Sequence, residues 1–281
     1  MSKKRAKHKN RLITAAVYAT AFLGVALSFC GIAEAVTDNY ARILPSYTKE
    51  DLTETLAKAE WTESDYEFLY RQTGLGKSGL DALKDEPDRI LEIQNSLFYE
   101  GTLKHELAAF SSPHDYLENY TAAMAPLEDG DVLVTSSCHT FGWRNGHAAI
   151  VVNADDNQVI ESVSPGMPSS YGDTEWFAQS SNFILLRLKG VSKEERAAIA
   201  RQAELTLLRV PYSLAVGIFT NKDLKDNVTK THCSHLVWQA YKNFGYDIDA
   251  DGGPVCTSRD IALSPLFEVV QVYGFDLEKL W

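Results

Sequence analysis

Short β-rich segments precede an amphipathic helix in the second half of this chain, and this order constrains the fold more than any other feature. The segments are rich in aliphatic residues and cover 131–135, 147–152, 158–163 and 183–188. The turn-forming run 153–157 separates the second segment from the third, which predicts a β-hairpin. The helix begins near Cys233 and has apolar residues on one face. Strands grouped ahead of helices predict an α+β domain with an antiparallel sheet rather than a doubly wound parallel sheet.

Residues 36–126 have a helical pattern that predicts a lobe ahead of these strands. Apolar residues recur at helical spacing after Tyr47, and Thr62 is a candidate N-cap for a second helix. Glycines between Gly74 and Gly79 interrupt the pattern. We expect this helical lobe to pack against or shape a neighbouring site, with its aromatic side chains in its core.

Residues 1–35 have the pattern of an export signal. Six of the 27 Lys and Arg residues lie between Lys3 and Arg11, and an uncharged apolar stretch follows over residues 12–33. Ala33-Glu34-Ala35 supplies the small residues of a cleavage site. We therefore expect a cleaved signal peptide. A membrane anchor through residues 12–33 is the alternative, because about 20 apolar residues span a bilayer. Both predict an extracytoplasmic protein, secreted or anchored to the outer face of the cell membrane.

The rest of the chain is strongly acidic. Residues 36–281 carry 21 basic and 37 acidic side chains, which gives a formal charge of −16. Such a surface repels phosphate backbones. We therefore expect no nucleic-acid partner.

Cys233 is the candidate nucleophile. Three cysteines lie beyond residue 35, so at least one thiol is unpaired outside the cell. The sequence does not decide whether Cys138 and Cys256 form a disulfide. Thr231 is a candidate N-cap, which places Cys233 at the start of the helix. A helix N-terminus lowers the pKa of a thiol and offers backbone N–H groups to a developing oxyanion. The alternative role of Cys233 is that of a small buried hydrophobic residue.

His147 is the candidate general base, and Glu161 is the residue that would orient it. His147 follows Gly146 and begins a predicted strand, where a side chain at the end of a sheet can face a helix terminus. With the hairpin turn centred near Asp155, Glu161 lies on the same face as His147. A carboxylate there can hold one imidazole nitrogen and direct the other toward a thiol. These residues predict a Cys-His-Glu arrangement.

These segments resemble NlpC-type cell-wall peptidases, in a rearranged order. Cys233-Ser-His-Leu-Val237 is similar to the cysteine segment of that family, and Gly146-His147 and Val159-Ile-Glu161 are similar to its two strand segments. The cysteine segment comes last here, as in the circularly permuted papain-like amidases of the YiiX/YaeF type. The resemblance covers roughly residues 128–270. This chain departs from the orthodox motif at His235, where the family has glycine, and at His232 before the cysteine.

The resemblance implies a permuted papain-like catalytic domain over residues 127–281. It implies that Cys233 is the nucleophile, that His147 is the general base and that Glu161 orients it. Tyr212 would line the substrate site, and its alternative role is that of a core aromatic residue. No metal or organic cofactor is required.

The activity that the resemblance implies is that of a cysteine amidase or peptidase. It would hydrolyse an amide bond through an acyl-enzyme. Extracytoplasmic placement makes a peptidoglycan peptide or a lipid-linked acyl-amino acid the expected substrate. The sequence leaves the oligomeric state open.

Three alternative functions stay open. A zinc site can be drawn from five residues, Cys138, His139, His232, Cys233 and His235. Their spacing matches neither a C-x2-C nor an H-E-x-x-H pattern. An acyltransferase of the lecithin:retinol acyltransferase type shares the permuted order but usually has histidine where Glu161 stands. A non-catalytic surface binding domain would keep the fold and show no thiol reactivity at neutral pH.

Overall fold

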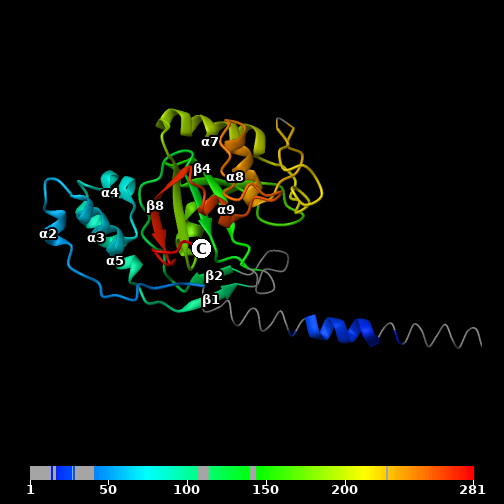
Figure 1. The fold of residues 1–281 in the computed structure, drawn as a ribbon, viewed down its shortest axis with the longest axis horizontal. Helices are drawn as coiled ribbons and strands as arrows, with labels where there is room; N and C mark the ends of the chain where they lie inside the picture. The colour runs from blue at the N-terminus through cyan, green and yellow to red at the C-terminus, as the bar shows by residue number, and fades with distance from the viewer. Residues whose placement is uncertain are drawn as a thin grey trace, which may run out of the picture. The chain divides into compact units, whose positions relative to one another are not determined.

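A six-stranded antiparallel sheet forms the centre of the fold (Figure 1). Its strands lie in the spatial order β6-β5-β4-β3-β7-β8, and every neighbouring pair is antiparallel. They are β3 (Val132–Thr135), β4 (His147–Asn153), β5 (Gln158–Glu161), β6 (Ser170–Asp173), β7 (Phe183–Leu188) and β8 (Phe267–Tyr273). The predicted α+β class with an antiparallel sheet is confirmed.

The structure is a computed structural model. It describes residues 14, 17–26, 28, 41–106, 114–139, 144–225 and 227–281. The described residues from 41 onward form one compact unit. The predicted cleavage site at 33–35 lies outside the described residues, as does most of the predicted leader, although residues 17–26 are helical. Within the described part of the chain, no helix combines the length and the apolar character needed to cross a membrane.

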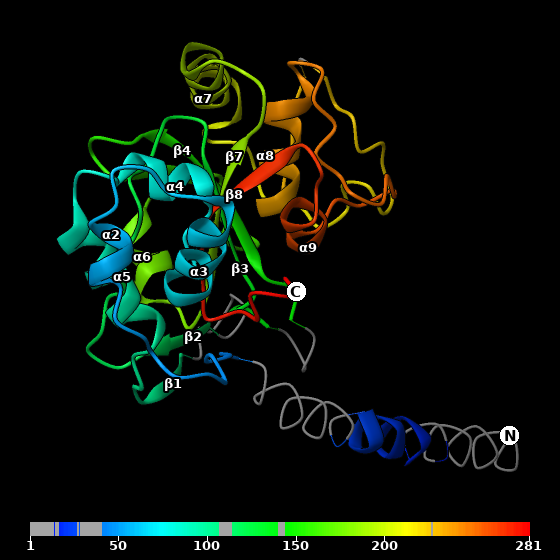
Figure 2. The same cartoon turned by 60° about the vertical axis from the view of Figure 1, so that its left-hand side comes forward.

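Helices cover both faces of the sheet (Figure 2). One layer contains α2 (Thr53–Leu56), α3 (Glu63–Thr73), α4 (Lys77–Ala82), α5 (Pro87–Leu97) and α6 (Thr174–Gln179). The other layer contains α7 (Lys193–Leu207), α8 (Cys233–Lys242) and α9 (Ser258–Ala262). The division of the chain at residues 126 and 127 stays a prediction.

Alternation of side chains along the strands produces two cores. Val132, Val134 and Ile150 are fully buried against α7 and α8, in what we term the α8 core. Leu133 and Ala149 point to the opposite face and pack with α3 to α6, in what we term the lobe core. Successive residues of a strand face opposite sides. The aliphatic runs therefore belong to strands that are buried on both faces.

A two-stranded sheet interrupts the region predicted to be helical. β1 (Leu103–Glu106) pairs antiparallel with β2 (His114–Leu117), so the helical prediction is wrong for these residues. β2 also forms bridges to Cys138 and to Ser180. These partners are distant in sequence, and local hydrophobic periodicity carries no information about them.

Side-chain contacts fix the starts of two helices, and one of them is the predicted start at Thr62. Thr62 caps α3 and forms a capping box with Asp65. Ser192 caps α7, and its Oγ accepts the backbone N–H of Glu195 at 3.2 Å. Each contact satisfies a backbone donor that has no carbonyl partner within the helix.

Candidate active site

Cys233 is the first residue of α8 and is half-buried. His232 is the N-cap, and its Nδ1 accepts the backbone N–H of His235 at 3.4 Å. The prediction that Thr231 caps this helix is wrong, because Thr231 Oγ1 lies 2.9 Å from Nδ1 of the His235 ring instead. Cys233 nevertheless occupies the helix position at which the dipole and the first N–H groups stabilise a thiolate.

The structure brings His147 and Glu161 together with Cys233. His147 Nε2 lies 2.6 Å from Glu161 Oε2, and the His147 ring lines the same cavity as the thiol of Cys233 and lowers the pKa of that thiol. A carboxylate only accepts, so Nε2 carries a proton and Nδ1 is left for the sulfur. The pairing of Ile150 with Ile160 confirms the predicted hairpin, and with it the shared face of His147 and Glu161.

The three side chains meet at the end of the sheet, where the two layers of the fold come together. His147 lies on the same face of β4 as Ala149, and Glu161 lies on the same face of β5 as Val159. Ala149 and Val159 belong to the lobe core. α8, which carries Cys233, covers the opposite face of the sheet. His147 is the first residue of β4, so its ring can reach past the sheet end to the sulfur.

The electrostatics of the site favour a thiolate and an imidazolium. Burial on its own raises the pKa of Cys233, but hydrogen bonds with His147 and His232 outweigh it and hold that pKa well below the ordinary value. Burial on its own lowers the pKa of His147, but hydrogen bonds with Cys233 and Glu161 raise it to about 10. Each charge therefore stabilises the other near neutral pH.

Packing and a glycine hold the imidazole and the carboxylate in place. The His147 ring stacks on Phe177, with centroids 5.7 Å apart, and meets the edge of Trp176 at 5.4 Å. On β6, a Cβ atom at Gly172 would lie 2.3 Å from Oε1 of Glu161. Gly172 thus leaves the space that the Glu161 carboxylate occupies.

The three residues open into a cavity of about 260 Å³. Tyr212 lines this cavity, as predicted, and its backbone bridges to Thr231 just before α8. Burial raises the pKa of Tyr212, so its phenol keeps its proton and is a hydrogen-bond donor.

Several residues of the cavity wall were not predicted. Glu106 and His114 come from β1 and β2, Trp176 from α6, and Cys138 from the loop after β3. Burial lowers the pKa of His114 to about 4, so its ring is neutral, and its Nε2 lies 2.8 Å from Ser180 Oγ. No local sequence pattern marks these residues, because non-local strand pairing places them at the cavity.

The three cysteines of the described chain are all free. The disulfide between Cys138 and Cys256 that the sequence left open is not formed. Burial raises the pKa of both of these thiols. Cys233 differs from them in having an imidazole partner that lowers its pKa.

The alternative zinc site is not assembled. The ring of His235 is turned away from Cys233, and its Nε2 donates to the carbonyl of Lys222 at 2.8 Å. Over the residues that the structure describes, metal-ligand side chains gather in two groups, His105-Asp115-His139 and Asp249-Asp251-Asp260. Neither group contains Cys233.

The fold and the site define an α+β protein with a Cys-His-Glu arrangement at the end of an antiparallel sheet. Its structure is similar to the crystal structure of metalloprotein yiiX from Escherichia coli O157:H7, DUF1105. The two chains are 16% identical, the match covers 54% of this chain and 99% of that chain, and the TM-score is 0.42. No family model and no curated protein matches the chain.

Proposed function

We propose that this chain is a cysteine hydrolase that cleaves an amide bond through an acyl-enzyme on Cys233. The proposal is carried by the grouping of Cys233, His147 and Glu161 around one cavity, where Glu161 holds the His147 ring by a hydrogen bond. A thiol with an ordinary pKa of about 8.5 is mostly protonated at neutral pH, whereas a thiolate is a strong nucleophile. The lowered pKa of Cys233 supplies that thiolate.

In the acylation step the Cys233 thiolate attacks the carbonyl carbon of the substrate amide. The backbone N–H groups at the start of α8 stabilise the developing oxyanion. The C–N bond then breaks as the His147 imidazolium gives its Nδ1 proton to the leaving amine, which leaves a thioester on Cys233. Glu161 holds the ring in this orientation throughout.

Deacylation reverses the direction of proton transfer. Neutral His147 takes a proton from a water molecule, and the resulting hydroxide adds to the thioester carbonyl. The C–S bond breaks, the carboxylic acid is released, and Cys233 returns as a thiolate beside the imidazolium. Attack by an amine in place of water would make the chain an acyltransferase.

The proposed substrate is a peptidoglycan peptide or a lipid-linked acyl-amino acid outside the cytoplasm. A cavity of about 260 Å³ supports a short peptide or amino-acid group at the reacting centre. The basic and apolar segments at the start of the sequence support export, to the cell exterior or to the outer face of the membrane.

Thiol labelling tests the proposed nucleophile. The full chain is treated with limiting iodoacetamide at about pH 6, where an ordinary thiol is almost fully protonated, and the label is located by peptide mass spectrometry. We expect label on Cys233 and little on Cys138 or Cys256. The label should fall in a Glu161→Gln variant and stay unchanged in Glu67→Gln, a control at an exposed position of α3.

A substrate screen tests the reaction. Muropeptides and N-acyl amino acids are offered separately, and the acyl-enzyme is trapped by acid quenching and weighed. A thioester on wild-type protein that is absent from Cys233→Ser supports the proposal. In the labelling experiment, equal labelling of Cys138, Cys233 and Cys256, or label absent from Cys233, would contradict the proposed nucleophile.

A further inference from the structure

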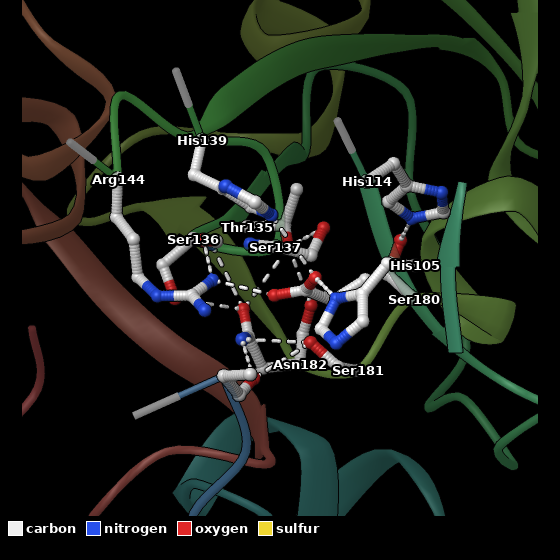
Figure 3. Close-up of polar contacts among 12 residues, drawn as sticks. His105, His114, Thr135, Ser136, Ser137, His139, Arg144, Ser180, Ser181 and Asn182 are labelled. Atoms are coloured by element: carbon white, nitrogen blue, oxygen red, sulfur yellow. Dashed lines mark hydrogen bonds and ion pairs between the residues drawn. The ribbon is translucent and has the colours of Figure 1, made fainter. Parts of the chain in front are cut away.

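Three metal-binding side chains meet behind one wall of the cavity. His105 Nδ1 lies 2.5 Å from Asp115 Oδ1, and His139 Nε2 lies 3.1 Å from the same oxygen. One ligand atom from each residue lies within 4.8 Å of the other two. Figure 3 shows His105 and His139 converging from different segments of the chain.

The distances from the two imidazole nitrogens to Asp115 Oδ1 are close to those between neighbouring ligands of a tetrahedral metal ion, and the two nitrogens lie within 4.8 Å of each other. Zinc binds imidazole nitrogen and carboxylate oxygen at about 2.0–2.2 Å, so neighbouring ligands lie roughly 3.3 Å apart. The present pairs would have to open by only a few tenths of an ångström to about one ångström. Two imidazoles and one carboxylate favour a borderline transition metal over calcium or magnesium, which take oxygen ligands.

The group is buried except on the side of His105, which is exposed to solvent. Asp115 is fully buried and His139 is 3% exposed, whereas the side chain of His105 is 43% exposed. A closed site would need a fourth protein ligand, but an open side can be filled by water. The ion could therefore enter past His105.

A second layer of contacts orients the carboxylate. Arg144 Nη1 donates to Asp115 Oδ2 at 2.7 Å and to the carbonyl of Ser136 at 3.1 Å. The guanidinium thus holds one carboxylate oxygen and leaves the other turned toward the two imidazoles. Asn182 fixes the same loop by accepting the N–H of Ser136 at 2.8 Å. Outer contacts of this kind set the orientation of metal ligands in proteins.

We infer that His105, Asp115 and His139 form a zinc site that fixes the wall of the catalytic cavity. Each ligand is the sequence neighbour of a residue that lines the cavity. His105 precedes Glu106, Asp115 follows His114 and His139 follows Cys138, and these three neighbours all face the cavity. His105 pairs with Asp115 across β1 and β2, and β2 bridges to Cys138. The ion would tie the paired strands β1 and β2 to the loop after β3.

The role of this ion rests on the proposed function, but its existence does not. Zinc would act on the wall and not on the reacting atoms, since Cys233 and His147 are outside the ligand set. Metal content and affinity are therefore the primary readout, and hydrolysis is the secondary one. Loss of the ion should raise KM for the substrate more than it lowers kcat.

The test uses the full chain with the Cys233→Ser substitution, which removes the thiolate as a competing zinc ligand. Protein stripped with EDTA is titrated with zinc chloride, and bound metal is counted by mass spectrometry after dialysis. We expect one zinc ion per chain. His105→Ala and Asp115→Asn should each weaken binding by roughly 100-fold or more.

Three additions keep the test decisive. His105 is partly exposed, so His105→Ala should fold even if Asp115→Asn does not, and circular dichroism checks this. Asp251→Asn in the acidic group is the matched control and should bind zinc as the parent does. The cobalt(II) form should show visible d–d bands without a thiolate charge-transfer band, because Cys138 is not a ligand.

The contrary result is a protein that takes up no zinc, or one that binds it equally well after either ligand substitution. The three residues would then be a hydrogen-bonded network around Arg144 and Asp115. Either result would leave the proposed Cys233 chemistry standing, because thiol labelling tests that chemistry independently.

Discussion

The carboxylate of Glu161 contacts the imidazole of His147 and acts on the sulfur of Cys233 only through that ring. This makes Glu161 a positioning residue in the proposed mechanism, whereas His147 transfers protons. Gly172 is also a positioning residue, because its lack of a side chain leaves the space that the Glu161 carboxylate occupies. Residue-scale tests can therefore separate chemistry from positioning.

The pH dependence of amide hydrolysis should have two limbs. On the acidic side kcat/KM should fall only as the Cys233 thiolate is protonated, at a pH well below the ordinary thiol pKa, because that pKa is lowered. On the alkaline side it should fall near pH 10, because His147 has a pKa of about 10 and loses the proton that the leaving amine needs. Alkylation of Cys233 needs no such proton and should not fall there. Parallel alkaline limbs for the two reactions would contradict the assignment of His147.

Gly172→Ala should reduce kcat without unfolding the protein. The new Cβ would lie 2.3 Å from Glu161 Oε1, so the carboxylate must leave its place beside His147. Because the obstructed atom is the end of a flexible side chain, the strand itself can stay in register. We expect a loss of roughly 10-fold or more, part of the ~10²–10⁴ that general acid–base catalysis supplies.

A double-variant cycle identifies the cause of that loss. Glu161→Gln and Gly172→Ala should not be additive, because both disturb the same contact. Additive losses in kcat, measured on the same substrate, would mean that Gly172 acts elsewhere.

At the scale of elements, a buried ion pair joins two neighbouring strands of the sheet. Arg187 of β7 donates from Nε and Nη2 to the two oxygens of Asp131, at 2.8 and 2.7 Å, just before β3. The Asp131 side chain is 0% exposed and that of Arg187 is 7% exposed. Removing one partner therefore leaves an uncompensated buried charge.

Arg187→Ala should lower the free energy of unfolding by about 3–5 kcal/mol. Glu92→Ala breaks an exposed pair with Arg89 and should cost less than about 1 kcal/mol. Urea denaturation of the two variants measures both values. Similar losses would show that burial does not set the strength of the Arg187 pair.

The elements also show which parts of the fold a sequence can reveal. The register of β4 and β5 was predictable because a hairpin links segments that are neighbours in sequence. The position of its turn determines that His147 and Glu161 lie on the same face of the sheet. The caps at Thr62 and Ser192 were predictable because a cap and its helix are contiguous. The bridges of β2 to Cys138 and Ser180 were not predictable, since these partners are distant from β2 in the chain.

The candidate site divides in the same way. Cys233, His147 and Glu161 stood in recognisable segments, whereas nothing near His114 or Glu106 indicated a cavity wall. Thr231 was expected to cap α8 from its residue type alone. The flanking histidines changed that outcome, because His232 supplies a ring nitrogen as the cap and His235 engages Thr231.

At the scale of the whole molecule, the charge distribution along the chain predicts its placement. Six basic residues precede the uncharged segment 12–33, and the acidic remainder follows it. The positive end of such a segment stays on the cytoplasmic side.

An alkaline phosphatase reporter joined after residue 40 should therefore be active, because that enzyme folds in an oxidising compartment. Replacing the six basic residues with Gln should lower the reporter activity of intact cells by several-fold. A fusion placed after residue 8, ahead of the apolar segment, is the inactive control. A reporter that is silent at residue 40 would place the chain in the cytoplasm and remove cell-wall peptides as substrates.

The meeting of two layers at the end of the sheet has a consequence for measurement. Cys233 and His147 keep their contact only while α8 and the lobe-facing side of β4 are aligned, so the reactivity of the thiol in acid reports that alignment. In a partly unfolded state that keeps its helices and loses its side-chain packing, this reactivity should disappear while far-ultraviolet circular dichroism is still native-like. Alkylation of Cys233 in acid would thus report whether the tertiary structure is intact, and a single alkylating reagent would measure it in a crude sample.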